Sequence, residues 1–238
     1  MPTHAASVTR VPHFTLVHGL GVSPLYFEPL RRVLAAEHDV LVPLMPGFGP
    51  SPRPVRPMSV EDHAEFLLRV LEEAGATRTV LVGQSMGAQF VVEAAARRPD
   101  LVDAVVLIGP VTNASRRTAL GQGLGLALDI PWEPPRTRAV VFYDYVRCGP
   151  RWFLTELRAM LAYRIEDRLR EVQAPVLVLR GVHDAIAPQR WVEFLADRAN
   201  RGSTDTVRPG THNVHHANPA AVAAAIDRFL AAARAIPA

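Results

Sequence analysis

The chain has 238 residues, of which 49% are hydrophobic and 21% are charged, so it can bury a full core and is expected to form one α/β domain. Its 26 basic residues are all arginine, and they alternate with 23 acidic residues to give a formal net charge of +3, which does not favour a nucleic-acid-binding surface. The single cysteine, Cys148, excludes an intrachain disulfide and gives no metal-site spacing.

No targeting or membrane-spanning segment is predicted. Met1 to Arg10 carries no apolar run of signal-peptide length, and no later run approaches the roughly 18 apolar residues of a spanning helix. We therefore expect a cytoplasmic protein without a membrane or nucleic-acid partner. The sequence leaves the oligomeric state open.

The first third of the chain alternates predicted strands and helices. Phe14 to Val17 is a short apolar run typical of a buried strand, and it leads into His18-Gly19-Leu20-Gly21. The amphipathic run Pro24 to Glu37 predicts a helix, and Val40 to Pro43 predicts the next strand. A turn-rich loop, Pro46 to Pro52, follows that strand.

The second helix has a capping signature. Ser59 is followed three residues later by Asp62, and a helical spacing of apolar residues then continues to about Glu73. Gly75 is expected to end this helix.

The sequence Gly83-Gln84-Ser85-Met86-Gly87 lies between an apolar run, Thr79 to Val82, and a helical pattern that continues to about Arg98. A serine at a sharp strand-to-helix turn needs a sparsely populated backbone conformation and small flanking residues, which glycine provides. The amide of Met86 then lies at a helix N-terminus, where free donors and the helix dipole favour an oxyanion. The pentapeptide alone is a weak signal, but its position between these two elements makes it specific.

The alternation continues with a strand at Val105 to Ile108 and then fails from Val111 to Val172. Three helix-like pieces are predicted in that insertion, near Ala114 to Leu128, Arg136 to Arg147 and Pro150 to Arg170. The insertion contains two of the three tryptophans and three of the four tyrosines of the chain, and its aromatic residues are Trp132, Phe142, Tyr143, Tyr145, Trp152, Phe153 and Tyr163. These rings either line an apolar pocket or pack the insertion on itself.

Two polar loops follow the last predicted strands. Val176 to Leu179 leads to Asp184, which either has a chemical role or caps the helix that runs from Pro188 to about Ala199. A final weak strand, Thr204 to Val207, precedes a loop with three histidines, His212, His215 and His216, and an alanine-rich helix. The histidines have no second ligand cluster near them in sequence, so no metal site is expected.

Together these motifs resemble those of the α/β-hydrolases, with a Gly-x-Ser-x-Gly turn, a Gly-x-x-Asp-x-x-x-Pro loop and a histidine loop in that chain order. The resemblance covers nearly the whole chain. It implies the α/β-hydrolase fold, a mostly parallel, doubly wound sheet with a helical cap insertion. Residues 1–110 and 173–238 would form the core, and residues 111–172 the cap. Because little chain precedes Phe14, we expect the sheet to lack part of its N-terminal edge.

The resemblance assigns a catalytic triad. Ser85 would be the nucleophile, Asp184 the acid and His212 the base. His212 matches the family's Gly-x-Gly-His loop, in which Thr211 replaces the second glycine. His215 is the competing candidate for the base.

The resemblance also assigns two oxyanion donors. The loop after the first strand would supply the amide of Leu20 beside that of Met86. His18 is expected to hold this loop by hydrogen bonding rather than to take part in chemistry.

The predicted function is that of a serine hydrolase, a carboxylesterase acting on a small to medium apolar or aromatic acyl group, without a cofactor. The expected substrate pocket is lined by cap residues, namely Trp132, Phe142, Tyr145 and Trp152. A thioesterase, a lactonase and a carbon-carbon bond hydrolase of a ring-cleavage diketone are the alternatives. A ligand-binding or cyclase-like protein on the same scaffold is an alternative of another class.

Overall fold

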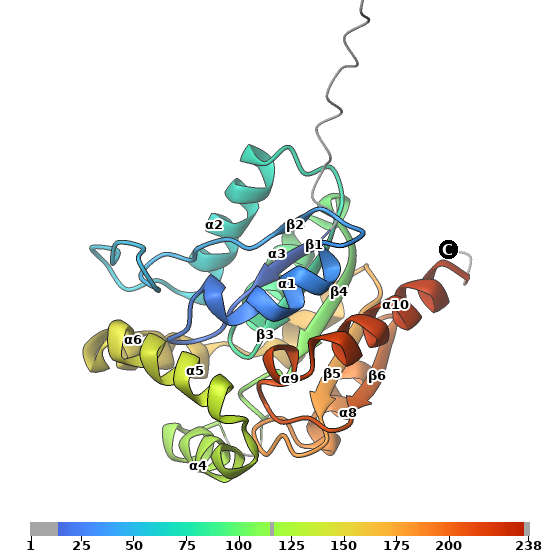
Figure 1. Ribbon diagram of the computed structural model, residues 1–238. Coiled ribbons are helices and arrows are strands. Elements are labelled where there is room, and N and C mark those ends of the chain that lie inside the picture. Colours follow the sequence, from blue (N-terminus) through green and yellow to red (C-terminus); the bar gives the residue numbers. More distant parts are fainter. Residues whose placement is uncertain (1–13, 115–116, 236–238) are drawn as a thin grey trace, which may run out of the picture.

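A computed structural model describes residues 14–114 and 117–235, so the expectation for Met1 to Arg10 lies outside the described residues. Its centre is a six-stranded, all-parallel sheet with the strand order β2-β1-β3-β4-β5-β6 (Figure 1). The strands are β1 (Phe14–Val17), β2 (Val40–Leu41), β3 (Thr79–Gln84), β4 (Val102–Ile108), β5 (Val176–Gly181) and β6 (Gly202–Val207). The doubly wound parallel sheet is thus confirmed.

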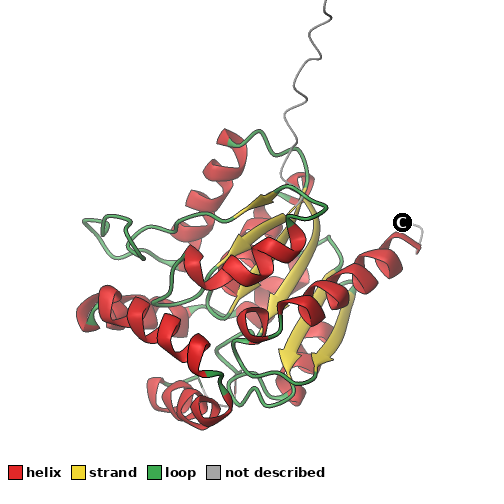
Figure 2. Ribbon diagram, viewed as in Figure 1, coloured by secondary structure: helices red, strands yellow, loops and turns green. Residues whose placement is uncertain are grey.

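Helices cover both faces of this sheet (Figure 2). Those outside the insertion are η1 (Pro24–Phe27), α1 (Glu28–Leu34), α2 (Val60–Glu73), α3 (Gly87–Arg97), η2 (Pro99–Leu101), α8 (Gln189–Arg198), α9 (Val214–Ala217) and α10 (Pro219–Ala235). Helices α1 and α10 pack on one face, and α2, α3 and α8 on the other. Each face buries its own apolar cluster, which explains why the central strands are continuous apolar runs rather than alternating ones.

The capping box of α2 has the geometry that its sequence predicts. The Ser59 hydroxyl accepts from the Asp62 amide at 3.1 Å, and the Asp62 carboxylate accepts from the Ser59 amide at 3.0 Å. Gly75 follows the helix with φ +67°, a conformation that favours glycine. In contrast, β2 has only two residues, because the chain leaves the sheet edge before Pro43.

The insertion between β4 and β5 is helical. It contains α4 (Ala119–Asp129), η4 (Ile130–Trp132), α5 (Pro135–Cys148), α6 (Pro150–Ala162), α7 (Ile165–Arg168) and η5 (Leu169–Glu171). The helix expected from Ala114 begins only at Ala119, and residues 115 and 116 lie outside the described part. The helix expected to reach Arg170 ends at Ala162, since Tyr163 is extended at ψ 136°. The cap boundaries 111–172 stay a prediction.

Buried polar contacts tie the insertion to the core. His63 on α2 and Glu156 on α6 are both fully buried, and Nε2 of the histidine lies 2.8 Å from Oε2 of the glutamate. On α3, the Gln89 side chain donates to the carbonyl of Met160 at 2.9 Å. Because removing one partner of such a buried pair leaves the other unpaired, these contacts fix α6 against α2 and α3.

The strands β5 and β6 point toward the side of the molecule on which α4 lies (Figure 1). Loops at the carboxyl ends of the strands therefore meet the insertion, which is the arrangement in which open α/β sheets form their sites. No helix within residues 14–114 and 117–235 combines the length and apolar character needed to cross a bilayer.

Candidate active site

Ser85 lies at the turn between β3 and α3 in a left-handed backbone conformation, with φ +56°. A non-glycine residue in this region is strained and is held there by its surroundings. The Ser85 amide donates to the carbonyl of Ile108 at 3.0 Å, which fixes the turn to the neighbouring strand β4. This is the conformation that the Gly-x-Ser-x-Gly sequence predicts.

The two flanking glycines allow the strand and the helix to approach. A Cβ atom on Gly83 would lie 2.4 Å from the carbonyl oxygen of Gly87, and one on Gly87 would lie 2.2 Å from that of Val17. Both distances are much shorter than a van der Waals contact, and the backbone oxygens concerned cannot move aside. Any side chain at either position would therefore displace the turn that carries Ser85.

Asp184 and His212 form a buried pair. Asp184 follows β5, and its Oδ1 accepts from the amides of Ile186 at 2.9 Å and Ala187 at 2.8 Å. These two bonds aim its Oδ2 at His212, whose Nδ1 lies 3.1 Å away. Because Asp184 is engaged with its own loop and with His212, it does not cap α8, for which the structure shows no side-chain cap.

The charges of this pair stabilise each other. Burial alone would raise the pKa of Asp184, but the neighbouring His212 and the hydrogen bonds to its carboxylate hold that pKa below its usual value. Burial alone would lower the pKa of His212, but Asp184 and two further carboxylates, Asp129 and Glu133, raise it above 6.5. Each of these two charges therefore stabilises the other when both are present.

Ser85 and His212 line one cavity of about 170 Å³ at the carboxyl edge of the sheet. Leu20 and Tyr145 also line it, and most of the other lining side chains are apolar. Gly19 brings the loop after β1 against the serine turn, because a Cβ atom there would lie 2.9 Å from Cβ of Ser85. Leu20 thus belongs to a loop that contacts the Ser85 turn, whereas Met86 directly follows Ser85 in the chain and its side chain is fully buried.

His18 lies beneath this loop and is fully buried. Its Nδ1 donates to the Gly19 carbonyl at 3.1 Å, and its Nε2 accepts from the Met45 amide at 3.4 Å. Burial lowers the pKa of His18 to about 4, so the ring is neutral at pH 7. These contacts fit a residue that holds the loop rather than one that reacts.

Of the four aromatic residues expected in the pocket, only Tyr145 lines the cavity. It shares the inner face of α5 with Val141, one turn before it, whereas the Phe142 side chain points outward and is 71% exposed. Trp132 is 62% exposed and stacks on His183, with ring centroids 4.6 Å apart. Trp152 is buried against Gly47, where a Cβ atom would lie 2.4 Å from the indole. Phe153 joins Tyr145 in the cavity wall.

Sequence reasoning missed two acidic residues of the insertion, Asp129 and Glu133, which are buried next to His212. In the sequence these two acids flank the apolar stretch Ile130-Pro131-Trp132. Acidic residues at such positions are ordinarily interpreted as exposed to solvent. Burial, and to a smaller extent the Asp184 charge and the Glu133 side chain, raise the pKa of Asp129 to about 7.

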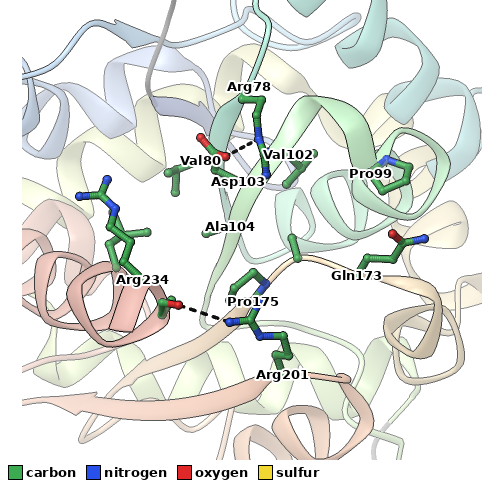
Figure 3. A pocket seen from close by; sticks show the side chains of 13 residues that line it. Arg78, Val80, Pro99, Val102, Asp103, Ala104, Gln173, Pro175, Arg201 and Arg234 are labelled. Carbon is green, nitrogen blue, oxygen red and sulfur yellow. Dashed lines mark hydrogen bonds and ion pairs between the residues drawn. The ribbon is translucent and has the colours of Figure 1, made fainter. Parts of the chain in front are cut away.

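A second cavity, of about 350 Å³, lies at the opposite edge of the sheet (Figure 3). Its lining includes the residues just before or at the start of β3, β4 and β5, among them Arg78 and Asp103, which form an ion pair at 2.5 Å. None of the predicted catalytic residues lies here. Since ligands of open α/β sheets bind at the carboxyl ends of the strands, the cavity beside Ser85 is the candidate active site.

The described residues contain no group of three or more histidine, cysteine, aspartate or glutamate side chains placed to hold a metal ion. The polar side chains that line the cavity include Ser85 and His212, and the Asp184 carboxylate lies against the His212 ring. This set is suited to nucleophilic and acid-base chemistry.

Comparison with known proteins agrees with this geometry. The family model described as the alpha/beta hydrolase fold matches residues 12–131, and one described as TAP-like protein matches residues 158–236. The chain is 25% identical, over 90% of both chains, to a protein of Caulobacter segnis that is named as a carbamate hydrolase, RutD. It is 27% identical over 95% of its length to polyketide synthase ThaQ of Burkholderia thailandensis, of which it spans only 12%.

Among solved structures, the enol-lactonase of Burkholderia xenovorans LB400 superposes with a TM-score of 0.77 at 21% identity, over 93% of this chain and 92% of that one. At this identity the likeness bears on the fold alone. The family match, the parallel sheet and the strained serine turn lead to one assignment. The chain belongs to the α/β-hydrolase fold family.

Proposed function

We propose that this protein is a serine hydrolase that cleaves a carboxylic ester of a small apolar or aromatic acyl group. The observation that carries the proposal is the convergence at one cavity of a serine in a strained turn, with φ +56°, and a histidine whose Nδ1 lies 3.1 Å from a buried aspartate. The order of the three residues along the chain is the order that the family uses.

The mechanism follows from the position of the proton on His212. Its Nδ1 faces the Asp184 carboxylate and carries the hydrogen, so Nε2 is free to accept the Ser85 proton as the serine oxygen attacks the ester carbon. The imidazolium that forms is stabilised by Asp184, and it then protonates the departing alcohol. Water repeats the two steps on the acyl-enzyme and releases the carboxylic acid and free Ser85.

The negative charge on the carbonyl oxygen needs donors in the tetrahedral intermediate. The amides of Leu20 and Met86 are the donors in this proposal, because the first belongs to the loop that contacts Ser85 and the second lies at the start of α3. Each preorganised donor contributes about 3 to 4 kcal/mol to the stabilisation of such a transition state.

The cavity supports a small acyl group. Its volume of about 170 Å³ lies below the roughly 300 to 1,000 Å³ of sites for drug-sized ligands. The apolar wall formed by residues such as Leu126, Tyr145 and Phe153 would bury an alkyl or aryl group and exclude water. We therefore propose acyl chains shorter than those of typical lipids.

Hydrolysis of p-nitrophenyl esters from acetyl to decanoyl tests this function. We expect kcat/KM to be highest for a short acyl chain and to fall as the chain outgrows the cavity. Turnover should be lost after stoichiometric labelling with a fluorophosphonate, which reacts with an activated serine. Absence of turnover across the series from a folded protein would contradict the esterase proposal.

The pH dependence of kcat/KM is a second prediction. The reaction needs neutral His212, whose pKa is raised above the ordinary value of 6.5. Activity should therefore be low when the imidazole is protonated and should rise with pH through a limb centred above pH 6.5. Measurement of kcat/KM from pH 5 to 9 on the best ester checks this. An acid limb centred near pH 5 would contradict the role given to the carboxylates around His212.

A carbamate or lactone is the second candidate substrate class. It is favoured by the relative named as a carbamate hydrolase, which matches this chain over 90% of both lengths. The same triad can attack a carbamate or a lactone carbonyl, since each gives an oxyanion at the same position. Small carbamates and lactones assayed beside the esters separate the two classes by the ratio of kcat/KM values.

A further inference from the structure

Two carboxylates of the cap bind the backbone of the loop that carries His212. The Asp129 carboxylate, at the end of α4, accepts from the His212 amide, with its two oxygens 3.0 and 3.2 Å from that nitrogen. The Glu133 carboxylate accepts from the Asn213 amide at 3.0 Å and from the Asn213 side chain at 2.6 Å. Both acids are nearly inaccessible to solvent, so each hydrogen bond is made in a low-dielectric environment.

The same part of the cap, residues 129–137, makes two further contacts with the catalytic loops. Thr137 Oγ1 lies 2.9 Å from Nδ1 of His216, four residues after His212. Trp132 stacks on His183, which directly precedes Asp184. This cap segment thus touches both the histidine loop and the acid loop, although it is far from either in sequence.

We propose that Asp129 and Glu133 are positioning residues, which hold the His212 loop in its active conformation and set the charge around its imidazole. The inference rests on the proposed function, in which His212 is the base. It gives the cap a role in the chemistry itself, in addition to forming the cavity wall.

The loop needs such partners. His212 precedes α9, so its amide has no intrahelical acceptor, and a buried amide without one destabilises the folded loop. A backbone carbonyl would satisfy the amide equally well. A carboxylate adds negative charge beside the imidazole, and that charge favours the imidazolium that forms when Ser85 gives up its proton.

The two acids also interact with each other. Burial, followed by neighbouring charges and the Glu133 side chain, raises the pKa of Asp129 to about 7. Oε2 of Glu133 is buried and has no hydrogen-bond partner among the described residues.

Other titratable groups surround His212 and enter its titration. They come from four parts of the chain. These groups are Arg180 and Asp184 in β5 and the loop after it, Asp129 and Glu133 in the cap, Tyr26 in η1 and His215 in α9. Three of these groups are carboxylic acids. Removal of one cap carboxylate should therefore shift the titration of His212 without abolishing its pairing with Asp184.

The test compares Asp129→Asn, Asp129→Ala and Glu133→Gln with wild type on the best ester. Asp129→Ala should lower kcat by about tenfold or more with KM changed less than about threefold, since the loop loses an acceptor but the cavity keeps its wall. Asp129→Asn and Glu133→Gln each keep an acceptor oxygen and should lower kcat less than Asp129→Ala does. Both should also move the acid limb of kcat/KM to lower pH, because a charge that favours the imidazolium is gone.

Glu156→Gln is the matched control. Glu156 is also a buried cap carboxylate that binds a core residue, but its partner is His63, away from the cavity. This variant should lower thermal stability and leave the acid limb where it is in wild type. A role of Asp129 and Glu133 that is merely structural would make their variants behave in the same way as this control.

NMR titration of the His212 ring in wild type and Asp129→Asn provides a readout that does not depend on turnover. We expect the pKa of the ring to be lower in the variant. An unchanged ring titration together with an unchanged acid limb would overturn the inference. If the ring pKa shifts as expected but no ester is hydrolysed by wild type, the positioning of His212 stands and the proposed substrate class fails.

Discussion

Ser85→Ala is expected to lower kcat for the best ester by on the order of 10⁴- to 10⁶-fold, with a far smaller change in KM. The hydroxyl is the atom that forms the acyl-enzyme, and the remaining oxyanion donors and cavity can give only residual catalysis. Alanine occupies the same space and has no reactive group, so binding of the ester is retained. Steady-state kinetics on purified proteins and intact-mass analysis after fluorophosphonate treatment measure the two effects.

Ser203→Ala is the matched control for this replacement. Ser203 lies exposed on β6, where its hydroxyl contacts the Val176 carbonyl at 3.3 Å, and it is remote from the cavity. Its loss should leave kcat within about twofold of wild type, as surface substitutions usually do. Undiminished turnover in Ser85→Ala, or labelling that persists at another serine, would remove Ser85 as the nucleophile.

The serine turn and the sheet could be predicted from sequence because their requirements are local. Gly83 and Gly87 are required because a Cβ atom on either would lie only 2.4 or 2.2 Å from a backbone oxygen of the turn or of the neighbouring strand, which leaves no room for a side chain. The continuous apolar runs of the central strands reflect burial on both faces. Each of these signals is contained in a few consecutive residues.

The pocket could not be predicted in the same way, because it depends on which face of each cap helix turns inward. On α5, Val141 and Tyr145 face the cavity, whereas Phe142 and Tyr143 are exposed, and all four are equally suited to an apolar wall by composition. Phe142, which was expected in the wall, follows Val141 by one residue and is therefore rotated by about 100° around the helix axis, away from the inner face. Only the docking of α5 on the core separates these residues.

Asp129 and Glu133 were missed for a related reason. An acid at the end of a helix is most often solvated, and nothing in the local sequence distinguishes Asp129 from such a residue. Its burial follows from a contact with His212, 83 residues later in the chain. Long-range pairing of this kind is visible only once the cap and the sheet are placed against each other.

His212→Ala is the second replacement with a large expected effect. It should lower kcat by on the order of 10⁴-fold or more, because His212 lines the cavity with Ser85 and is the residue that would accept its proton and carry the charge opposite Asp184. The acid limb of kcat/KM should disappear with the imidazole. Steady-state kinetics across pH 5 to 9, with circular dichroism to establish that the variant is folded, measure this result.

His215 is the competing histidine, and its surroundings explain why its replacement should have little effect on catalysis. The ring is fully buried, 4.3 Å from the Tyr26 ring and 4.5 Å from the Phe27 ring between centroids. Neither ring nitrogen has a hydrogen-bond partner among the described residues, and burial holds its pKa well below 6.5. His215 therefore stays neutral and packs as an apolar group would.

A conservative apolar replacement, His215→Leu, should keep kcat within about threefold of wild type and leave the acid limb in place. Leucine fills most of the ring's volume, so the variant tests the chemistry of the residue and not the space it occupies. The two histidines are three residues apart, and only His212 has a carboxylate at Nδ1. If His215→Leu lost turnover and His212→Ala retained it, His215 would be the catalytic base and His212 would not. The contact between His212 and Asp184 would then be structural.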